Sequence, residues 1–215
     1  MLRSSTALAV AFLLAACGSD STTTNTTTTP ISCTSYCASM ATTCVEGDVQ
    51  FTGLNGTCDS YCGTSNSWPD GVTGATSGNT GACRVTHVAL AAAATDAATK
   101  SLHCGHAGPS GGNTCGTWCE NYCFLALRNC TGANGAGLGF TDNASCLTAC
   151  AAFPTDGIVG GTVAPHGDNV QCRIYHAGAA SAGASGPVPH CGHAQVISAS
   201  AIGGTTANGP CRPGA

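Results

Sequence analysis

The apolar and polar positions divide the chain into a short apolar start, a polar stretch and a long remainder punctuated by cysteine. Residues 7–16 are all apolar, but a run of about ten residues is too short to cross a hydrocarbon layer of ~30 Å as a helix. Residues 18–30 have no periodic apolar position, so they cannot bury enough surface to offset the entropy of ordering. The pattern predicts a cleaved export signal at residues 1–16 and a disordered tether at residues 17–30.

Three cysteines in each half of the remaining chain follow the spacing i, i+4 and i+11, which places them on one helical face. They are Cys33, Cys37 and Cys44 in the first half, and Cys119, Cys123 and Cys130 in the second. Ser32 is a candidate N-cap for the first helix, and Thr117 with Glu120 has the pattern of a capping box for the second. We therefore predict one helix in each place.

A second, shorter helix is predicted after each of these, because another pair of cysteines follows at the spacing i, i+4. Thr57 and Ser145 are its candidate N-caps in the two halves. Two antiparallel helices with thiols one turn apart form a hairpin stapled twice, an arrangement that resembles the twin Cys-x3-Cys helical hairpins. Antiparallel pairing joins Cys33 to Cys62, Cys37 to Cys58, Cys119 to Cys150, and Cys123 to Cys146. Spacing alone does not establish connectivity.

A third helix is predicted from Cys83, where the sequence is alanine-rich, and from Cys172 in the second half. In the second copy we expect Gly178 to interrupt it. The closing segments, residues 103–109 and 190–194, are dense in glycine and lack periodicity. They are predicted to be loops.

The cysteine spacing shows that one module of eight cysteines occurs twice. Other residues fall in the same register, for example Tyr36 with Tyr122 and Arg84 with Arg173, and Trp68-Pro69 corresponds to Phe153-Pro154. The boundary lies between Cys115 and Cys119, which gives module 1 at residues 31–115 and module 2 at residues 116–215.

Composition points to covalent stabilisation, because 17 cysteines accompany 30 glycines and only two tryptophans. Cys17 precedes both modules, and the remaining sixteen cysteines are an even number, eight in each module. In an exported chain an even number of cysteines predicts disulfides, here four in each module. The set is Cys33, Cys37, Cys44, Cys58, Cys62, Cys83, Cys104, Cys115, Cys119, Cys123, Cys130, Cys146, Cys150, Cys172, Cys191 and Cys211. The predicted fold class is small, disulfide-rich and mainly α with long Gly-rich loops, each module being a stapled hairpin plus a third helix.

Charge excludes one class of partner. Charged residues make up 7% of the chain, against the usual ~25%, and the net charge is −4. The few basic residues are scattered, whereas a nucleic-acid binder needs a cluster that displaces counterions. We expect no nucleic-acid partner. Arg84 and Arg173 are expected to pair with a carboxylate or to cap a carbonyl.

The end of the apolar run, Leu14-Ala15-Ala16-Cys17, resembles the lipobox of bacterial lipoproteins. The resemblance implies that Cys17 receives diacylglycerol, with further acylation such as palmitate, and that the chain is cut just before it. Gly18 and Ser19 follow, and the lack of an Asp directly after the cysteine implies sorting to the outer membrane in that family. The acyl chains would hold the protein on the membrane at ~0.8 kcal/mol per buried methylene.

Six of the seven histidines occupy equivalent places in the two modules. They are His87, His103 and His106 in module 1, and His176, His190 and His193 in module 2, whereas His166 stands alone. Imidazole is the commonest ligand of zinc and copper, so with the thiols oxidised each set is a candidate Zn²⁺ or Cu²⁺ site or an axial position for haem. The alternative is that these side chains bond loop carbonyls that lack other partners. Thiolate ligation by the cysteines is disfavoured by export.

Enzyme signatures are missing: the chain has no Gly-x-Ser-x-Gly, no His-Glu-x-x-His and no P-loop. The mature part resembles Cys- and His-rich bacterial surface lipoproteins with repeated Cys-Arg-x-x-His and His-Cys-x-His elements, which implies no particular activity. The sequence therefore favours a non-enzymatic, lipid-anchored envelope protein with a binding or structural role and an unidentified protein or surface partner. The alternative is a metal-binding or redox accessory lipoprotein that uses the histidine sets.

Replacing Cys17 with Ser removes the thiol that would receive the lipid, and without the lipid the matching peptidase does not act. We expect Cys17→Ser to leave an uncleaved or soluble exported precursor, whereas the matched Ser19→Ala variant keeps the anchor. Membrane fractionation and the mass of the intact protein check this. If Cys17→Ser still partitions into membranes with the mature mass, the lipoprotein prediction is wrong.

Overall fold

The computed structural model describes Thr28 and residues 30–51, 57–62, 68–157, 166–181, 187–196 and 209–213. The predicted signal peptide, Cys17 and nearly all of the tether lie outside these residues. The described part is all-α, apart from one isolated antiparallel bridge between Thr28 and Val72. No helix in it is both long and apolar enough to cross a membrane.

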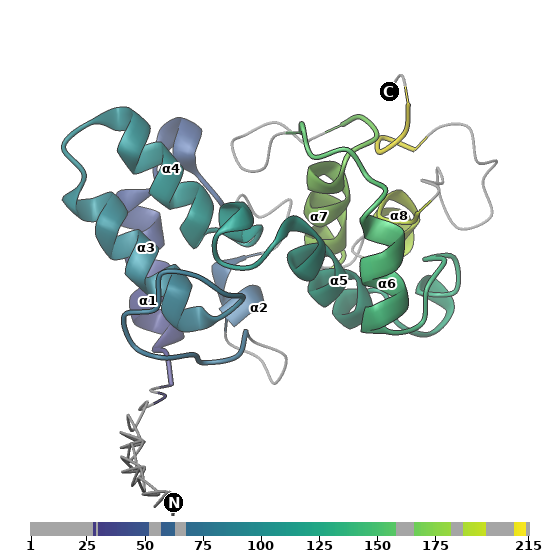
Figure 1. The fold of residues 1–215 in the computed structure, drawn as a ribbon, viewed down its shortest axis with the longest axis horizontal. Helices are drawn as coiled ribbons and strands as arrows, with labels where there is room; N and C mark the ends of the chain where they lie inside the picture. Colours follow the sequence, from purple (N-terminus) through teal and green to yellow (C-terminus); the bar gives the residue numbers. More distant parts are fainter. Residues whose placement is uncertain are drawn as a thin grey trace, which may run out of the picture.

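The helices fall into two groups of four that lie side by side in Figure 1. Module 1 contains α1 (Cys33–Thr43), α2 (Cys58–Cys62), α3 (Gly81–Ala93) and α4 (Ala97–Ala107). Module 2 contains α5 (Trp118–Asn129), α6 (Asn143–Cys150), α7 (Val170–Ala179) and α8 (Pro187–His193). Single 3-10 turns follow α1, α4 and α5, at Glu46–Asp48, Gly111–Asn113 and Gly132–Asn134.

Eight disulfides hold these helices, and each one joins two cysteines of the same predicted module. The four pairings predicted for the hairpins are confirmed: Cys33–Cys62, Cys37–Cys58, Cys119–Cys150 and Cys123–Cys146. The other four are Cys44–Cys104, Cys83–Cys115, Cys130–Cys191 and Cys172–Cys211. The prediction that all sixteen cysteines form disulfides is therefore also confirmed.

The helix starts agree with two of the four predicted caps. Ser32 accepts a hydrogen bond from the backbone N–H of Ser35, and Thr117 forms the predicted capping box with Glu120. Ser145, however, is not an N-cap. It lies in the first turn of α6 and completes a capping box with Asp142, which is the true cap. The sequence contained the signal for Asp142, since Asp is as good an N-cap as Ser.

The third helices begin before their cysteine, because a residue with a capping side chain lies three positions upstream. Thr80 caps α3 and Asn169 caps α7, each accepting from the backbone N–H of the cysteine itself. The expectation that Gly178 interrupts α7 is wrong, since the helix continues through this residue to Ala179. Gly178 is buried within the packed helix, and tertiary packing offsets the ~1 kcal/mol that a helical glycine costs.

The prediction of loops at residues 103–109 and 190–194 is also wrong for most of both segments. Residues 103–107 form the end of α4 and residues 190–193 form the end of α8. In each segment a fully buried cysteine is tied to the residue that caps the end of the module's first helix, through Cys44–Cys104 and Cys130–Cys191. This cross-link and the surrounding packing outweigh the low helix propensity of glycine. Each module therefore has a fourth helix.

Each module has a buried arginine stacked on an aromatic ring. The guanidinium carbon of Arg84 lies 4.0 Å from the ring centre of Trp68, and that of Arg173 lies 4.0 Å from the ring centre of Phe153. Arg84 donates to the carbonyls of Thr80 and Gly108. The expectation that these arginines cap carbonyls is confirmed. Burial lowers the pKa of Arg84 to about 9, so the side chain stays charged at neutral pH.

Arg173 repeats this arrangement and adds an ion pair. It donates to the carbonyls of Asn169 and Gln195, as Arg84 does to the equivalent loops of module 1. Its Nη2 also lies 2.7 Å from the carboxylate of Asp168. The expected carboxylate partner is thus present in module 2.

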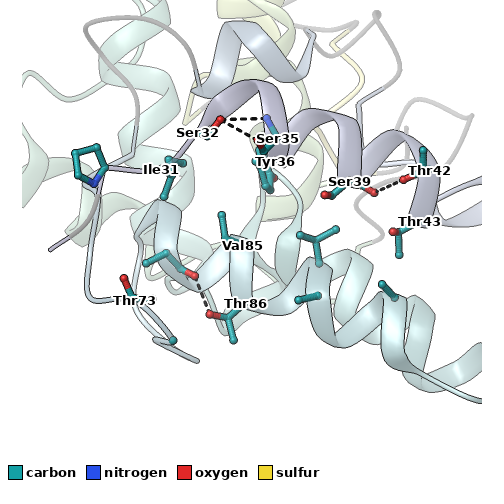
Figure 2. A pocket seen from close by; sticks show the side chains of 16 residues that line it. Ile31, Ser32, Ser35, Tyr36, Ser39, Thr42, Thr43, Thr73, Val85 and Thr86 are labelled. Carbon is teal, nitrogen blue, oxygen red and sulfur yellow. Dashed lines mark hydrogen bonds between the residues drawn. The ribbon is translucent and has the colours of Figure 1, made fainter. Parts of the chain in front are cut away.

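A groove of about 390 Å³ lies between α1 and α3 in module 1 (Figure 2). Its lining combines aliphatic side chains with the hydroxyls of Ser and Thr. The hydroxyls of Thr42 and Thr86 donate to backbone carbonyls of their own helices, at 3.0 Å to Ala38 and 3.0 Å to Ala82. None of the candidate histidines lines this groove.

One side chain of module 2 completes the surroundings of Arg84. Nη2 of Arg84 donates to Oδ1 of Asn121 at 2.6 Å, and Nδ2 of Asn121 donates to the carbonyl of Cys115 at 3.2 Å. Both Arg84 and Asn121 are fully buried. The two modules therefore share a buried hydrogen-bond network at their boundary.

Replacing Asn121 with Ala leaves a buried N–H of the Arg84 guanidinium without its acceptor. An unsatisfied buried group of this kind costs roughly 1–3 kcal/mol, and more when charged, so we expect a clear loss in the free energy of unfolding. Urea unfolding at pH 7 measures it, with Asn143→Ala at the exposed start of α6 as the matched control. An unchanged unfolding midpoint for Asn121→Ala would show that the contact does not stabilise the fold.

Candidate metal centres

The structure brings each predicted histidine set together. His87 projects from α3 and meets His103 and His106 from α4. In module 2, His176 comes from α7, and His190 and His193 come from α8. One ring nitrogen from each histidine lies within 4.8 Å of the others in its set. We call these sets triad 1 (His87, His103, His106) and triad 2 (His176, His190, His193).

The same nitrogen, Nδ1, points inward in both triads. In triad 2, Nδ1 of His176 lies 3.0 Å from Nδ1 of His190 and 3.3 Å from Nδ1 of His193. In triad 1, the Nδ1 atoms of His87 and His103 lie 2.9 Å apart. These separations are close to the N–N distance of about 3.3–3.4 Å that a tetrahedral Zn²⁺ with bonds of 2.0–2.1 Å requires.

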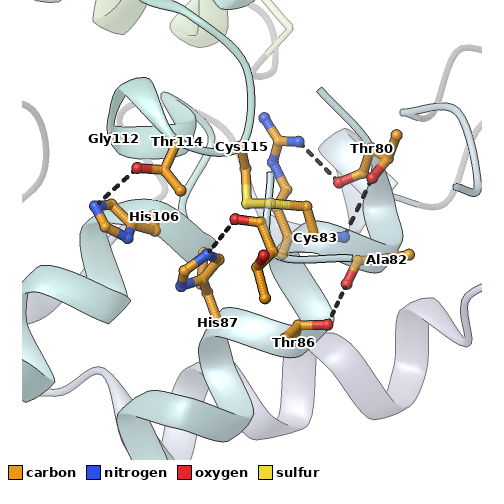
Figure 3. The surroundings of a disulfide bond; sticks show 12 residues. Thr80, Ala82, Cys83, Thr86, His87, His106, Gly112, Thr114 and Cys115 are labelled. Atoms are coloured by element: carbon orange, nitrogen blue, oxygen red, sulfur yellow. Dashed lines mark hydrogen bonds between the residues drawn. A yellow bond between two sulfur atoms is a disulfide. The ribbon is translucent and has the colours of Figure 1, made fainter. Parts of the chain in front are cut away.

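The outer nitrogens of triad 1 have partners that direct the lone pairs inward. Nε2 of His87 lies 3.1 Å from the carbonyl oxygen of Thr76, and a carbonyl only accepts, so Nε2 carries the proton and Nδ1 a lone pair. Nε2 of His106 lies 3.2 Å from the hydroxyl of Thr114. A hydrogen bond on the outer nitrogen is how proteins fix the tautomer of a metal-binding histidine. Figure 3 shows His87, and His106 with its neighbour Thr114.

Each triad also has a buried nitrogen with no hydrogen-bond partner among the described residues. In triad 1 this atom is Nδ1 of His106. In triad 2 it is Nε2 of His176, and the residue in register with Thr76 there is Pro165, which lies outside the described residues. A buried nitrogen without a partner is costly. At Nδ1 of His106, a metal ion would supply the missing interaction.

Burial keeps two imidazoles of each triad neutral at neutral pH. Burial and, to a smaller extent, the neighbouring imidazoles lower the pKa of His106 to about 4 and that of His176 to about 3. Burial also lowers the pKa of His87 and of His190. Neutral imidazole is the form that coordinates metals. Proton competition at these nitrogens therefore begins at a lower pH than the ~6.5 of an ordinary histidine.

A disulfide lies beside each triad. A ring nitrogen of His87 is within 4.8 Å of both sulfurs of Cys83–Cys115, and His176 has the same relation to Cys172–Cys211. Since the sulfurs are bonded to each other, they are not thiolate ligands in this state. The cysteine precedes the histidine by one helical turn, so the bridge fixes the helix from which the imidazole projects.

His166 takes no part in either triad. Its side chain is exposed, and its backbone carbonyl accepts a hydrogen bond from Asn169. The sequence spacing identified the six paired histidines but did not show that they converge, because their segments in α4 and α8 were predicted to be loops. The two histidines of α4, and likewise those of α8, are three residues apart. In a helix this spacing places both side chains on one face, so it was the available signal for their convergence.

Comparison with known proteins leaves the function to be argued from these residues. No family model, no curated protein and no solved structure matches the chain.

The lowered pKa values predict how stability depends on pH in the metal-free protein. Unfolded histidines take up protons near pH 6.5, whereas the buried ones in the folded state do so only at about 4 or below, so stability falls as pH drops through this window. We expect the urea midpoint to decrease between pH 7 and pH 4.5, in the presence of a chelator. The exposed carboxylates of Asp96 and Asp142 titrate below this window, because hydrogen bonds lower their pKa.

The matched variants separate the triads from other groups. Replacing His106 and His176, which have the lowest pKa values, together with Ala should weaken this pH dependence, whereas His166→Ala should keep it. A midpoint of the parent protein that does not change across the window would contradict the assignment of neutral, buried imidazoles.

Proposed function

We propose that this protein is an exported, lipid-anchored metal-binding protein that holds one Zn²⁺ or Cu²⁺ in each module. The observation that carries the proposal is the convergence of three imidazoles on one point, built twice from equivalent residues. In triad 2 the Nδ1 atoms of His190 and His193 both lie within hydrogen-bond distance of Nδ1 of the central His176. In triad 1 the outer nitrogens of two imidazoles are already hydrogen-bonded.

A purely structural role accounts for part of this arrangement. The contact of His87 with the Thr76 carbonyl is what a structural histidine in a glycine-rich environment would form. It does not account for Nδ1 of His106, which is buried without a partner among the described residues, since buried polar atoms normally find partners. The proton of His87 is on Nε2, which leaves a lone pair on the converging Nδ1, and this suits a cation at the centre.

The donor set favours particular metals. Three imidazole nitrogens suit zinc and copper, whereas Ca²⁺ and Mg²⁺ require oxygen ligands. Iron–sulfur clusters require cysteine thiolates, and the described cysteines are oxidised. The buried state of the disulfide cysteines beside the triads favours metal binding over a thiol–disulfide exchange role, because exchange needs an accessible sulfur.

The lipobox and the tether supply the location in this proposal. The acylated Cys17 would hold the chain on a membrane of the cell envelope, and a flexible tether of this length spans roughly 20 Å. The metal sites would then stand off the bilayer, where they can take up ions from the surrounding compartment. We propose a binding role with no catalytic step.

Metal analysis of the oxidised, tag-free protein tests this function. We expect two Zn²⁺ or Cu²⁺ per chain after incubation with the metal and removal of the excess. His103→Ala with His106→Ala should reduce this to one, because triad 2 remains intact, and His190→Ala with His193→Ala should do the same through triad 1. The matched control His166→Ala should retain both ions.

Two results would overturn the proposal. One is a parent protein that retains no metal at micromolar concentration. The other is a pair of double variants that bind as much metal as the parent, which would place the ions elsewhere.

A further inference from the structure

Each triad supplies three ligands, whereas zinc in a closed structural site has four. Among the described residues no carboxylate, no thiolate and no further imidazole joins either triad. The sulfurs grouped with His87 and His176 belong to the intact disulfides Cys83–Cys115 and Cys172–Cys211. The described part of the chain therefore leaves the fourth position unfilled.

The segments outside the described residues do not supply the missing ligand. Those within the two modules contain no His, Cys, Asp or Glu, as the sequence shows for residues 52–56, 63–67, 158–165, 182–186, 197–208 and 214–215. The first 27 residues contain only Cys17 and Asp20 of these types, and both belong to the predicted anchor and tether. No side chain of the usual metal-binding types remains within the modules.

The neutral oxygens near triad 1 are already engaged on the outer side of the rings. The Thr76 carbonyl contacts Nε2 of His87, and the Thr114 hydroxyl contacts Nε2 of His106. The nitrogens that face the centre are the other ones, Nδ1 of His87 and His103, which lie 2.9 Å apart, and the buried Nδ1 of His106 has no hydrogen-bond partner among the described residues. These oxygens therefore orient the ligands and do not complete the coordination shell.

Each triad lies closest to solvent on the side formed by α4 or α8. His87 and His176 are buried, whereas the two histidines from α4 and the two from α8 are only half-buried. Nδ1 of His106 is itself buried in the metal-free protein, so a donor from solution would enter past these half-buried rings. A donor from solution meets no competing protein ligand there.

Charge selects the kind of donor. A divalent ion held by three neutral imidazoles keeps its full charge of +2, and no carboxylate of the described residues lies in either triad to offset it. The nearest ionisable neighbour along α3 is also a cation, since Arg84 precedes His87 by one turn. An anion in the fourth position gains more Coulomb energy here than a neutral donor does.

We propose that each loaded triad keeps one coordination position for a small monodentate anion taken from solution. The inference rests on the proposed metal-binding function and adds a ligand class to it, namely hydroxide, carboxylate or a similar small anion. The protein then holds the metal as an exchangeable complex with an external ligand, which a closed structural site cannot do.

Cobalt and azide test this inference. Co²⁺ replaces Zn²⁺ in nitrogen sites and gives visible absorption bands that change when a ligand is added. We expect azide to produce a saturable spectral change in the Co²⁺-loaded protein, with one azide bound per cobalt. The double variants His190→Ala/His193→Ala and His103→Ala/His106→Ala isolate triad 1 and triad 2, and each should show the change with half the parent amplitude.

The outcomes separate the two proposals. If the protein binds two Co²⁺ but a large excess of azide leaves the spectrum unchanged, the fourth position is closed and this inference is wrong while metal binding stands. If metal analysis finds no Co²⁺ and no Zn²⁺ on the protein, both proposals are wrong. The His166→Ala variant should respond to azide as the parent does, which excludes the isolated histidine as the source of the signal.

Discussion

The disulfide Cys44–Cys104 and its counterpart Cys130–Cys191 are the constraints on which both triads depend. Each cysteine of α4 or α8 lies between the two histidines that its helix contributes. Tying it to the end of the module's first helix fixes both imidazoles in one step. The bridged residues are 60 and 61 positions apart, and closing loops of this length stabilises a fold by on the order of 4 kcal/mol through the unfolded state. Few large side chains are available to do this instead.

Non-covalent contacts hold the C-terminal ends of the same helices, three residues after these cysteines. The hydroxyl of Tyr36 donates to the carbonyl of Ala107 at 2.6 Å, and that of Tyr122 donates to Ala194 at 2.6 Å. The stacked arginines then bond the carbonyls just beyond, at Gly108 and Gln195. Burial raises the pKa of both tyrosines, so their hydroxyls remain protonated donors. The part of each helix that bears the histidines is thus fixed both by a disulfide and by hydrogen bonds from distant parts of the sequence.

Local signals in the sequence predicted the features that depend on neighbours in the chain. Helical spacing of cysteines gave the stapled hairpins, and the Thr117–Glu120 pattern gave a correct capping box. The internal repeat identified which histidines correspond. Residues 103–107 and 190–193 could not be predicted as helices in this way, because their glycines disfavour helix locally and their support comes from α1, α5 and long-range disulfides. The convergence of the imidazoles depends on these two helical segments, so it could not be predicted from the sequence either.

The hydrogen bond from Arg84 to Asn121 makes the interior of module 1 depend on a residue that is synthesised later, in module 2. A chain that emerges from its N-terminus presents Arg84 and Cys83 well before Cys115, and Asn121 comes last. The charged group at the centre of module 1 therefore acquires its last acceptor only when the first turn of α5 has formed. Module 1 can form its own disulfides early, but the guanidinium of Arg84 lacks one hydrogen-bond acceptor until module 2 starts to fold. The final stability of the first half of the chain therefore depends on the emergence of the second half.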